Sequence, residues 1–268
     1  MKLLIWAGIF CALVTCRQNN SADDDAIKAK LAFDDGDYES AIVHSTFAIL
    51  KDSLYTDMYA LRCRSYIEIG SCTEAIQDIQ EVYNQSHQIG YLTYVGFCYN
   101  EMGEFQKALV VYDSILVADS SLYMAWKGRA RAYTGLGQHE LAKKDQLKYL
   151  NYDSMDFRVW NSLGMNYSAL GILDSAKFSY HKSIILDSSQ WMAYYNISIL
   201  YAENGAWDSA LNYNLRAMSY TEEYGNLLLR ERGKLHFASG QPDSACFFWK
   251  ESLDDEAVEL YTNHCGSR

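Results

Sequence analysis

The fold of this 268-residue chain is decided by residues 160–180, which read WNSLGMNYSALGILDSAKFSY. In this stretch Tyr167 stands four residues before Gly171, and Ala176 stands five residues after it. A helix that carries the tyrosine can end at the glycine, because glycine readily adopts the positive φ that closes many helix C-termini. A second helix can begin two or three residues later, and the small alanine lets the two helices approach closely. The stretch therefore predicts two packed helices joined by a tight turn.

The same pattern recurs along the chain. Seven glycines follow one another at intervals of 34, 33, 34, 34, 34 and 35 residues, namely Gly36, Gly70, Gly103, Gly137, Gly171, Gly205 and Gly240. An alanine stands five residues after each glycine, at Ala41, Ala75, Ala108, Ala142, Ala176, Ala210 and Ala245. A tyrosine precedes the five internal glycines by four residues, at Tyr66, Tyr99, Tyr133, Tyr167 and Tyr201. This period indicates an array of helix pairs that bury their apolar faces by stacking on one another.

The composition also favours an all-helical chain. Only 1 of the 268 residues is proline, against a usual share of about 5%, so almost nothing interrupts helices. The 23 basic and 34 acidic residues give a net charge of -11, which argues against a general binder of nucleic-acid backbones. Asp-Ser pairs such as Asp174-Ser175 and Asp208-Ser209 stand just before the second helices. We expect their side-chain oxygens to cap these helices.

The repeat resembles that of the tetratricopeptide repeat family, whose 34-residue unit reads W-x2-L-G-x2-Y and then A-x3-F or Y. Four units carry the match: Trp160, Leu163, Gly164, Tyr167, Ala176 and Tyr180; Trp126, Ala130, Tyr133 and Ala142; Leu92, Gly96, Tyr99, Ala108 and Tyr112; and Tyr194, Tyr201, Ala210 and Ala217. The resemblance implies an all-α, right-handed superhelical solenoid of about seven helix-turn-helix repeats. Ala32 and His236 replace the tyrosine in the first and last units, and the proline usual at each unit's end is missing.

We expect the solenoid to span residues 22–260, followed by a C-terminal tail at 261–268. The expected repeats are 22–55, 56–88, 89–122, 123–156, 157–190, 191–224 and 226–260.

The N-terminal segment predicts export. Lys2 precedes an uncharged apolar run from Leu3 to Val14, which is too short to cross a membrane and is typical of a signal peptide, here 1–15. Leu13-Val14-Thr15-Cys16 resembles the lipobox of bacterial lipoproteins, although Thr15 stands where Gly, Ala or Ser is usual. The resemblance implies that Cys16 is lipidated and that residues 16–21 form a lipid-anchored leader.

The residues after Cys16 indicate where in the cell the protein is located. An Asp directly after the lipidated cysteine resembles an inner-membrane retention signal, but Arg17 stands at that position here. The resemblance therefore implies the outer membrane of the bacterial cell envelope. The run Asp23-Asp24-Asp25 has two interpretations. Such runs resemble surface-export signals of some lipoproteins, and acidic residues also favour the N-terminus of a helix. The sequence leaves open whether the protein faces the periplasm or the cell surface.

The sequence lacks the motifs of catalytic, cofactor and metal sites. Its six histidines have no H-E-x-x-H spacing, its cysteines form no C-x-x-C, and no G-x-S-x-G, G-x-x-x-x-G-K-[ST] or Rossmann glycine pattern occurs. We therefore predict that the protein is not an enzyme and needs no cofactor or metal. Cys63 and Cys98 occupy similar positions in neighbouring repeats, so a bridge between them is an alternative to buried free thiols.

The repeat register predicts a binding surface on the first helix of each pair. In the family, positions 5 and 9 of each unit line the concave groove. Through the seven units these positions hold Ala26 and Lys30, Ala60 and Arg64, Thr93 and Phe97, Lys127 and Arg131, Asn161 and Met165, Tyr195 and Ile199, and Arg230 and Lys234. Six of the fourteen are basic and none is acidic, whereas composition predicts about 1.2 basic residues. Arg158 at position 2 adds another cation.

Together with Arg158, the residues at positions 5 and 9 form a stripe along the first helices, which we call the first-helix stripe. This stripe suggests a groove for protein partners. We predict that Arg64, Lys127, Arg131, Arg158, Arg230 and Lys234 bind acidic groups of a partner peptide, while Phe97, Asn161, Met165, Tyr195 and Ile199 line the middle of the groove. The protein would then be a membrane-anchored, non-catalytic scaffold or adaptor. The alternative is a ligand-capturing lipoprotein for nutrient uptake, but such chains resemble much longer proteins with insertions that the uniform period here lacks.

Overall fold

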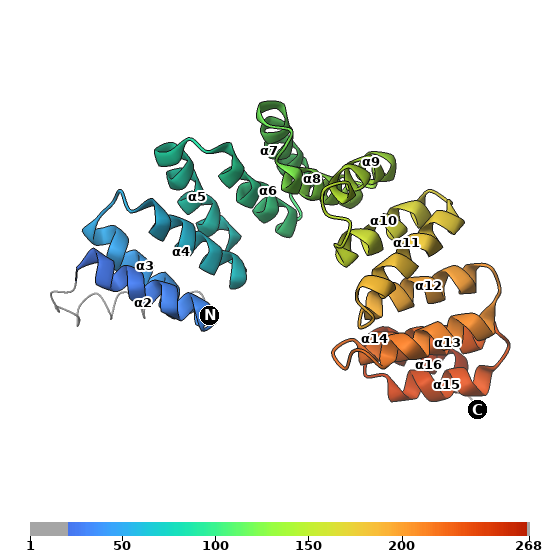
Figure 1. The fold of residues 1–268 in the computed structure, drawn as a ribbon. Coiled ribbons are helices and arrows are strands. Elements are labelled where there is room, and N and C mark those ends of the chain that lie inside the picture. The colour runs from blue at the N-terminus through green and yellow to red at the C-terminus, as the bar shows by residue number, and fades with distance from the viewer. Residues whose placement is uncertain (1–20, 267–268) are drawn as a thin grey trace. The chain divides into compact units, whose positions relative to one another are not determined.

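The computed structural model describes residues 21–266, and every regular element among them is helical (Figure 1). The chain divides into two compact units, Met1–Leu136 and Gly137–Arg268. The boundary falls inside the fourth expected repeat, between its first and second helices. No helix within residues 21–266 is long and apolar enough to cross a membrane.

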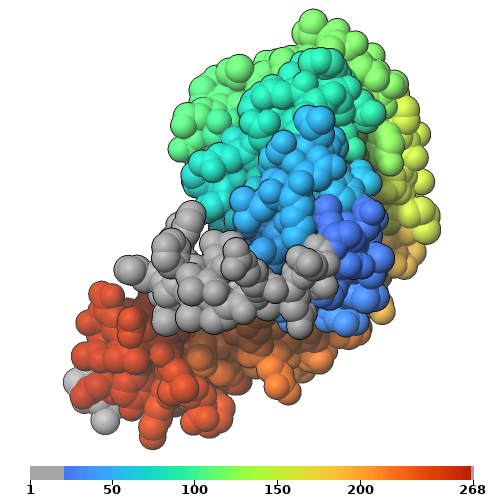
Figure 2. Space-filling model, turned by 90° about the vertical axis from the view of Figure 1, so that its left-hand side faces the viewer, coloured from blue at the N-terminus to red at the C-terminus, as the bar shows by residue number. Residues whose placement is uncertain are grey.

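Unit 1 contains seven α-helices and one short 3-10 helix among its described residues. They are α2 (Ala22–Asp34), α3 (Tyr38–Lys51), α4 (Thr56–Glu68), α5 (Cys72–Ser86), η1 (Ile89–Tyr91), α6 (Leu92–Glu101), α7 (Phe105–Ala118) and α8 (Tyr123–Gly135). Each α-helix packs on the next along the chain, and first helices of neighbouring repeats also touch, as α2 touches α4 and α6 touches α8. In the space-filling view the surfaces of these repeats follow one another from blue to green (Figure 2).

Unit 2 is built in the same way. Its helices are α9 (His139–Leu150), α10 (Phe157–Ala169), α11 (Leu173–Leu186), α12 (Trp191–Glu203), α13 (Trp207–Met218), α14 (Gly225–Ala238), α15 (Pro242–Glu251) and α16 (Asp255–Cys265). Consecutive helices again pack on each other. The predicted all-α solenoid of helix-turn-helix repeats is confirmed.

The turns inside the repeats follow the glycine lattice. All seven predicted glycines have positive φ, between 70° and 78°. In the fifth repeat the N–H of Ile172 donates to the carbonyl of Tyr167 at 2.9 Å. The same bond, from the residue after the glycine to the residue four before it, closes the turns at Gly36, Gly70, Gly103, Gly205 and Gly240. The Tyr-to-Gly spacing is therefore the spacing of one helix-ending turn.

Small residues set the distance between the paired helices. The seven alanines that follow the glycines are all 0% exposed. A Cβ added to Gly164 would lie 2.5 Å from the Tyr180 ring, and one added to Gly96 would lie 2.6 Å from the Tyr112 ring. In these two repeats the tyrosine of the second helix thus lies directly on the glycine of the first helix.

The Asp-Ser pairs before the second helices act differently from the prediction. The second helices α11 and α13 begin after Ile172 and Ala206, neither of which caps with its side chain. Asp174 and Asp208 lie one residue inside these helices, where they are first-turn acids, so the predicted caps are wrong. At the junctions between repeats, Asp187 accepts the N–H of Ser189 at 3.0 Å and closes the turn.

The C-terminus differs from the expected tail. Helix α16 extends to Cys265, and Asp254 caps it by accepting the N–H groups of Glu256 and Ala257 at 3.0 and 3.3 Å. A disulfide joins Cys246 on α15 to Cys265, with the two Cα atoms 5.8 Å apart. The last repeat is therefore followed by an additional helix that is covalently attached to it.

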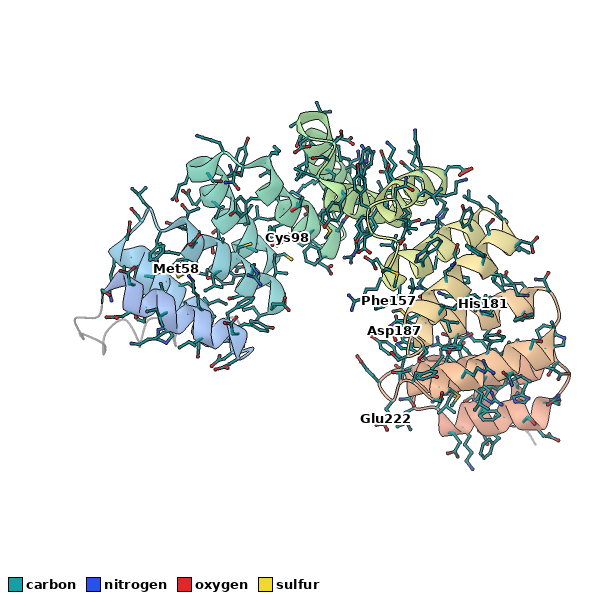
Figure 3. All side chains as sticks on the ribbon, in the orientation of Figure 1. Met58, Cys98, Phe157, His181, Asp187 and Glu222 are labelled. Atoms are coloured by element: carbon teal, nitrogen blue, oxygen red, sulfur yellow. A yellow bond between two sulfur atoms is a disulfide. The ribbon has the colours of Figure 1, made fainter. Side chains whose placement is uncertain are left out.

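The prediction of buried free thiols is wrong for Cys246 and Cys265, which form this disulfide, and is confirmed for the other described cysteines. Cys63, Cys72 and Cys98 are reduced and lie together in one apolar cluster of unit 1, where Figure 3 labels Cys98. Burial raises the pKa of the Cys63 thiol to about 12, so it stays protonated at neutral pH. Cys16 and the expected signal peptide lie outside the described residues.

Candidate partner-binding groove

The predicted stripe residues all lie on first helices of their repeats. In unit 1, Arg64 lies on α4, Phe97 on α6, and Lys127 and Arg131 on α8. In unit 2, Arg158, Asn161 and Met165 lie on α10, Tyr195 and Ile199 on α12, and Arg230 and Lys234 on α14. Each unit thus carries its own part of the stripe.

Two cations of the unit 1 stripe, Arg64 and Arg131, lie over aromatic rings. The guanidinium of Arg64 lies 4.4 Å from the centre of the Phe33 ring, and Arg64 is exposed. Arg131 is 6.0 Å from the ring centre of Phe97 and also forms an ion pair with Glu101. These contacts orient the cations without covering them, because both arginines remain exposed.

The first stripe residues of unit 2 have different surroundings. Asn161 is buried, and its side-chain oxygen accepts a hydrogen bond from Asn196 on α12 at 3.1 Å. It therefore connects two repeats, whereas Met165 is exposed. Phe157 and Asp187 lie at the same edge of the unit (Figure 3). The pKa of Asp187 is lowered mainly by hydrogen bonds from Ser189, and the charge of exposed Arg158 also contributes.

The two cations on α14 already have acidic partners within the chain. Arg230 donates to both carboxylate oxygens of Asp254 at 2.9 Å, and Glu231 and Glu256 lie 3.2 and 3.0 Å away. Lys234 pairs with Glu231 at 3.0 Å and with Glu256 at 2.6 Å. The pKa of Asp254 is lowered chiefly by the hydrogen bonds from Arg230, and that of Glu256 by the hydrogen bond from Lys234. Sequence reasoning missed these acids because Glu231 is at position 6, and Asp254 and Glu256 follow the second helix of the last repeat, outside the stripe positions.

A cleft opens beside this network, entirely within unit 2. Its volume is about 350 Å³, near the lower end of ligand sites in proteins. The stripe residues Tyr195, Ile199 and Lys234 contribute to its lining. The other lining residues are Ser198, Ala202, Glu203, Trp207, Glu231, Leu235 and Ala238. Of the apolar stripe residues, Tyr195 and Ile199 line this cleft, whereas Phe97 and Met165 do not.

Residues 21–266 contain no cluster of three or more His, Cys, Asp and Glu side chains able to hold a metal ion. Several histidines have local partners instead. His139 lies 2.8 Å from the side-chain oxygen of Asn166, and His236 stacks on Phe248 with ring centres 5.1 Å apart.

Comparisons with known proteins identify the fold. No protein-family model and no curated protein matches the sequence. Among solved structures, a tetratricopeptide repeat protein from Parabacteroides merdae matches with a TM-score of 0.70 at 21% identity, covering 90% of this chain and 97% of that one. PilW, described as a widely conserved type IV pilus biogenesis factor, matches with a TM-score of 0.67 at 16% identity, covering 79% of this chain and 100% of that one.

The C-terminal part of a repeat-containing protein from Cytophaga hutchinsonii matches with a TM-score of 0.61 at 17% identity, covering 86% of this chain and 97% of that one. At these identities the likeness concerns the fold. The glycine turns, the alanine contacts and the likeness to these three structures all indicate the same fold. The chain has the fold of tetratricopeptide repeat proteins.

Proposed function

We propose that the chain is a non-catalytic scaffold that binds extended segments of protein partners along the first-helix stripe. The observation that carries the proposal is the cleft beside Tyr195 and Ile199. These positions are fixed by the repeat period alone, and the structure has an open, largely apolar recess beside them. A recess with aromatic and aliphatic walls suits the anchoring side chain of a partner.

Acidic groups of a partner fit the cations that remain accessible. Arg64 and Arg158 are exposed, and no carboxylate of residues 21–266 lies within ion-pair distance of either. A partner carboxylate would form new ion pairs there. Arg131 would have to share a partner carboxylate with Glu101, so we expect it to contribute less.

We also propose that the scaffold is anchored to the outer membrane through a lipid on Cys16. The lipobox-like residues Leu13 to Cys16 support this proposal. The disulfide between Cys246 and Cys265 supports an exported protein independently, because structural disulfides persist in oxidising compartments such as the bacterial periplasm.

Capture from chemically crosslinked cell envelopes tests the scaffold. The full chain should retain a reproducible set of protein partners, and Tyr195→Ala with Ile199→Ala should lose them because the apolar wall is removed. The matched control is Phe178→Ala with Ile185→Ala on the second helix α11, where the side chains are 56% and 75% exposed. The proposal fails if both double variants retain the same partners as the original chain.

A further inference from the structure

The cleft of unit 2 carries a local charge opposite to the one expected from the stripe. Two cations, Arg230 and Lys234, are joined by ion pairs to three carboxylates, those of Glu231, Asp254 and Glu256. The network therefore has a surplus of one negative charge. Carboxylates from α14, from α16 and from its N-cap Asp254 thus give this edge of the cleft a negative charge, although the stripe positions here are basic.

A further carboxylate increases this surplus. Glu203, the last residue of α12, lines the cleft and is exposed. Its side chain has no ion pair or hydrogen bond with any other residue that the structure describes. The cleft and its edge thus hold two negative charges that no cation of residues 21–266 balances by an ion pair.

The apolar wall next to these charges includes an indole ring. Trp207, the first residue of α13, lines the same cleft as Glu203 and is half-buried. It has no ring contact with another aromatic residue of the described chain. An indole face attracts cations, and a carboxylate pairs with the ammonium of lysine or the guanidinium of arginine. Both groups favour a cationic side chain in the cleft.

We infer that this cleft selects a partner segment in which an apolar side chain is flanked by lysine or arginine. The apolar side chain would enter between Tyr195, Ile199 and Leu235, and the cation would pair with Glu203 beside Trp207. This inference rests on the proposed scaffold function. It adds that this part of the stripe recognises positive charge on the partner segment. An acidic segment would face the surplus carboxylates here and would bind to Arg64 or Arg158 instead.

Three fluorescently labelled peptides test the inference. They share a Gly-Ser background and a central Phe-Leu pair, which is flanked by lysines, by serines or by glutamates. Fluorescence anisotropy with the full chain in detergent should give the tightest binding for the lysine peptide, about tenfold tighter than for the serine peptide. Glu203→Gln should reduce this preference several-fold, and Trp207→Ala should weaken binding of all three peptides. Glu222→Gln, which changes an exposed carboxylate in the α13–α14 loop away from the cleft lining, should have no effect (Figure 3).

Equal or tighter binding of the glutamate peptide would overturn the inference, and so would a lysine preference that is unchanged in Glu203→Gln. Failure of all three peptides to bind, while partners are still captured from envelopes through Tyr195 and Ile199, would overturn the inference alone. Loss of specific capture in the envelope experiment would instead overturn the proposed function.

Discussion

Arg62 and Asp78 form a nearly buried ion pair that connects helices of unit 1. The guanidinium of Arg62 on α4 donates to both carboxylate oxygens of Asp78 on α5, at 2.8 and 2.6 Å, and to the hydroxyl of Thr46 on α3 at 3.0 Å. Burial raises the pKa of the Asp78 carboxyl, and the hydrogen bonds from Arg62 counteract this effect. The ion pair therefore compensates the burial of both charges between the two helices of the second repeat. The hydrogen bond from Arg62 to Thr46 connects this repeat to the first one.

Removing one member of this pair should be costly. Arg62→Ala leaves Asp78 buried without its partner, so we expect the free energy of unfolding to fall by about 3 to 5 kcal/mol, measured by urea denaturation. Arg64→Ala is the matched control, since this exposed arginine on the same helix has no acidic partner among the described residues. It should change stability by less than about 1 kcal/mol. Equal losses in the two variants would contradict this account of the pair.

Gly164 shows why some repeat glycines are needed for packing and not for backbone conformation. A Cβ at this position would lie 2.5 Å from the Tyr180 ring, so Gly164→Ala should lower the free energy of unfolding by about 1 to 3 kcal/mol through overpacking. Gly225, at the start of α14, has no atom within 4 Å of an added Cβ. Gly225→Ala should therefore leave stability unchanged or raise it slightly. A neutral Gly164→Ala variant in urea denaturation would show that Tyr180 does not fix the helix approach.

At the scale of elements, α16 is held by interactions that come from different parts of the sequence. Its N-terminal acids pair with Arg230 and Lys234 on α14, and its last residue forms a disulfide with Cys246 on α15. Ala257 on its inner side is buried in a cluster with Trp249. The helix closes the apolar end of the last repeat, as expected of a terminal element in a repeat array.

The ion pairs of α16 should make the stability of unit 2 depend on pH. The hydrogen bonds from Arg230 lower the pKa of Asp254, and the hydrogen bond from Lys234 lowers that of Glu256. A carboxyl whose folded pKa is lowered stabilises the fold above its unfolded pKa of about 4, and this stabilisation is lost as the pH falls through the folded value.

Arg230→Met tests this dependence. The variant should melt at a lower temperature than the original chain at about pH 7, and the two should converge at about pH 2, where the carboxylates are protonated in both. Circular dichroism during thermal unfolding measures the difference. A gap between the two melting temperatures that persists unchanged at low pH would mean that Arg230 stabilises α16 by packing and not by charge.

The sequence predicted those elements whose structure is determined by residues close together in the chain. The turns at the seven glycines depend on a short spacing and on positive φ, and all seven have the expected geometry. The predicted caps at Asp174 and Asp208 failed because the helices begin one residue before these aspartates, at Leu173 and Trp207. The disulfide and the neutralised Arg230 could not be predicted, because they depend on how α16 folds back, and no periodic pattern extends into that helix.

At the scale of the whole molecule, the charge of the stripe differs from one repeat to another. Exposed Arg64 in unit 1 and exposed Arg158 in unit 2 lack an acidic partner among the described residues, whereas Arg230 and Lys234 at the end of unit 2 have several. The sequence located the stripe residues because helix period determines position. It could not predict their net charge, because charge depends on neighbours from other elements.

Anchoring is a separate prediction for the whole chain. Cys16→Ser should abolish incorporation of a fatty-acid analogue and leave an unprocessed precursor or a soluble product, because serine lacks the thiol that receives the lipid. Metabolic labelling followed by membrane fractionation measures both effects. Cys63→Ser serves as the control, since this buried thiol of unit 1 has no part in anchoring. Undiminished labelling of Cys16→Ser would contradict the proposed anchor.

Site-specific photocrosslinking tests most directly whether partners bind along the first-helix stripe. A photoreactive amino acid would replace Ile199, which lines the cleft on α12, or Ile185, which is 75% exposed on the second helix α11. In living cells the full chain should form discrete adducts with partner proteins from position 199 and none from position 185. Adducts of equal yield from both positions, or from position 185 alone, would contradict the proposed binding surface.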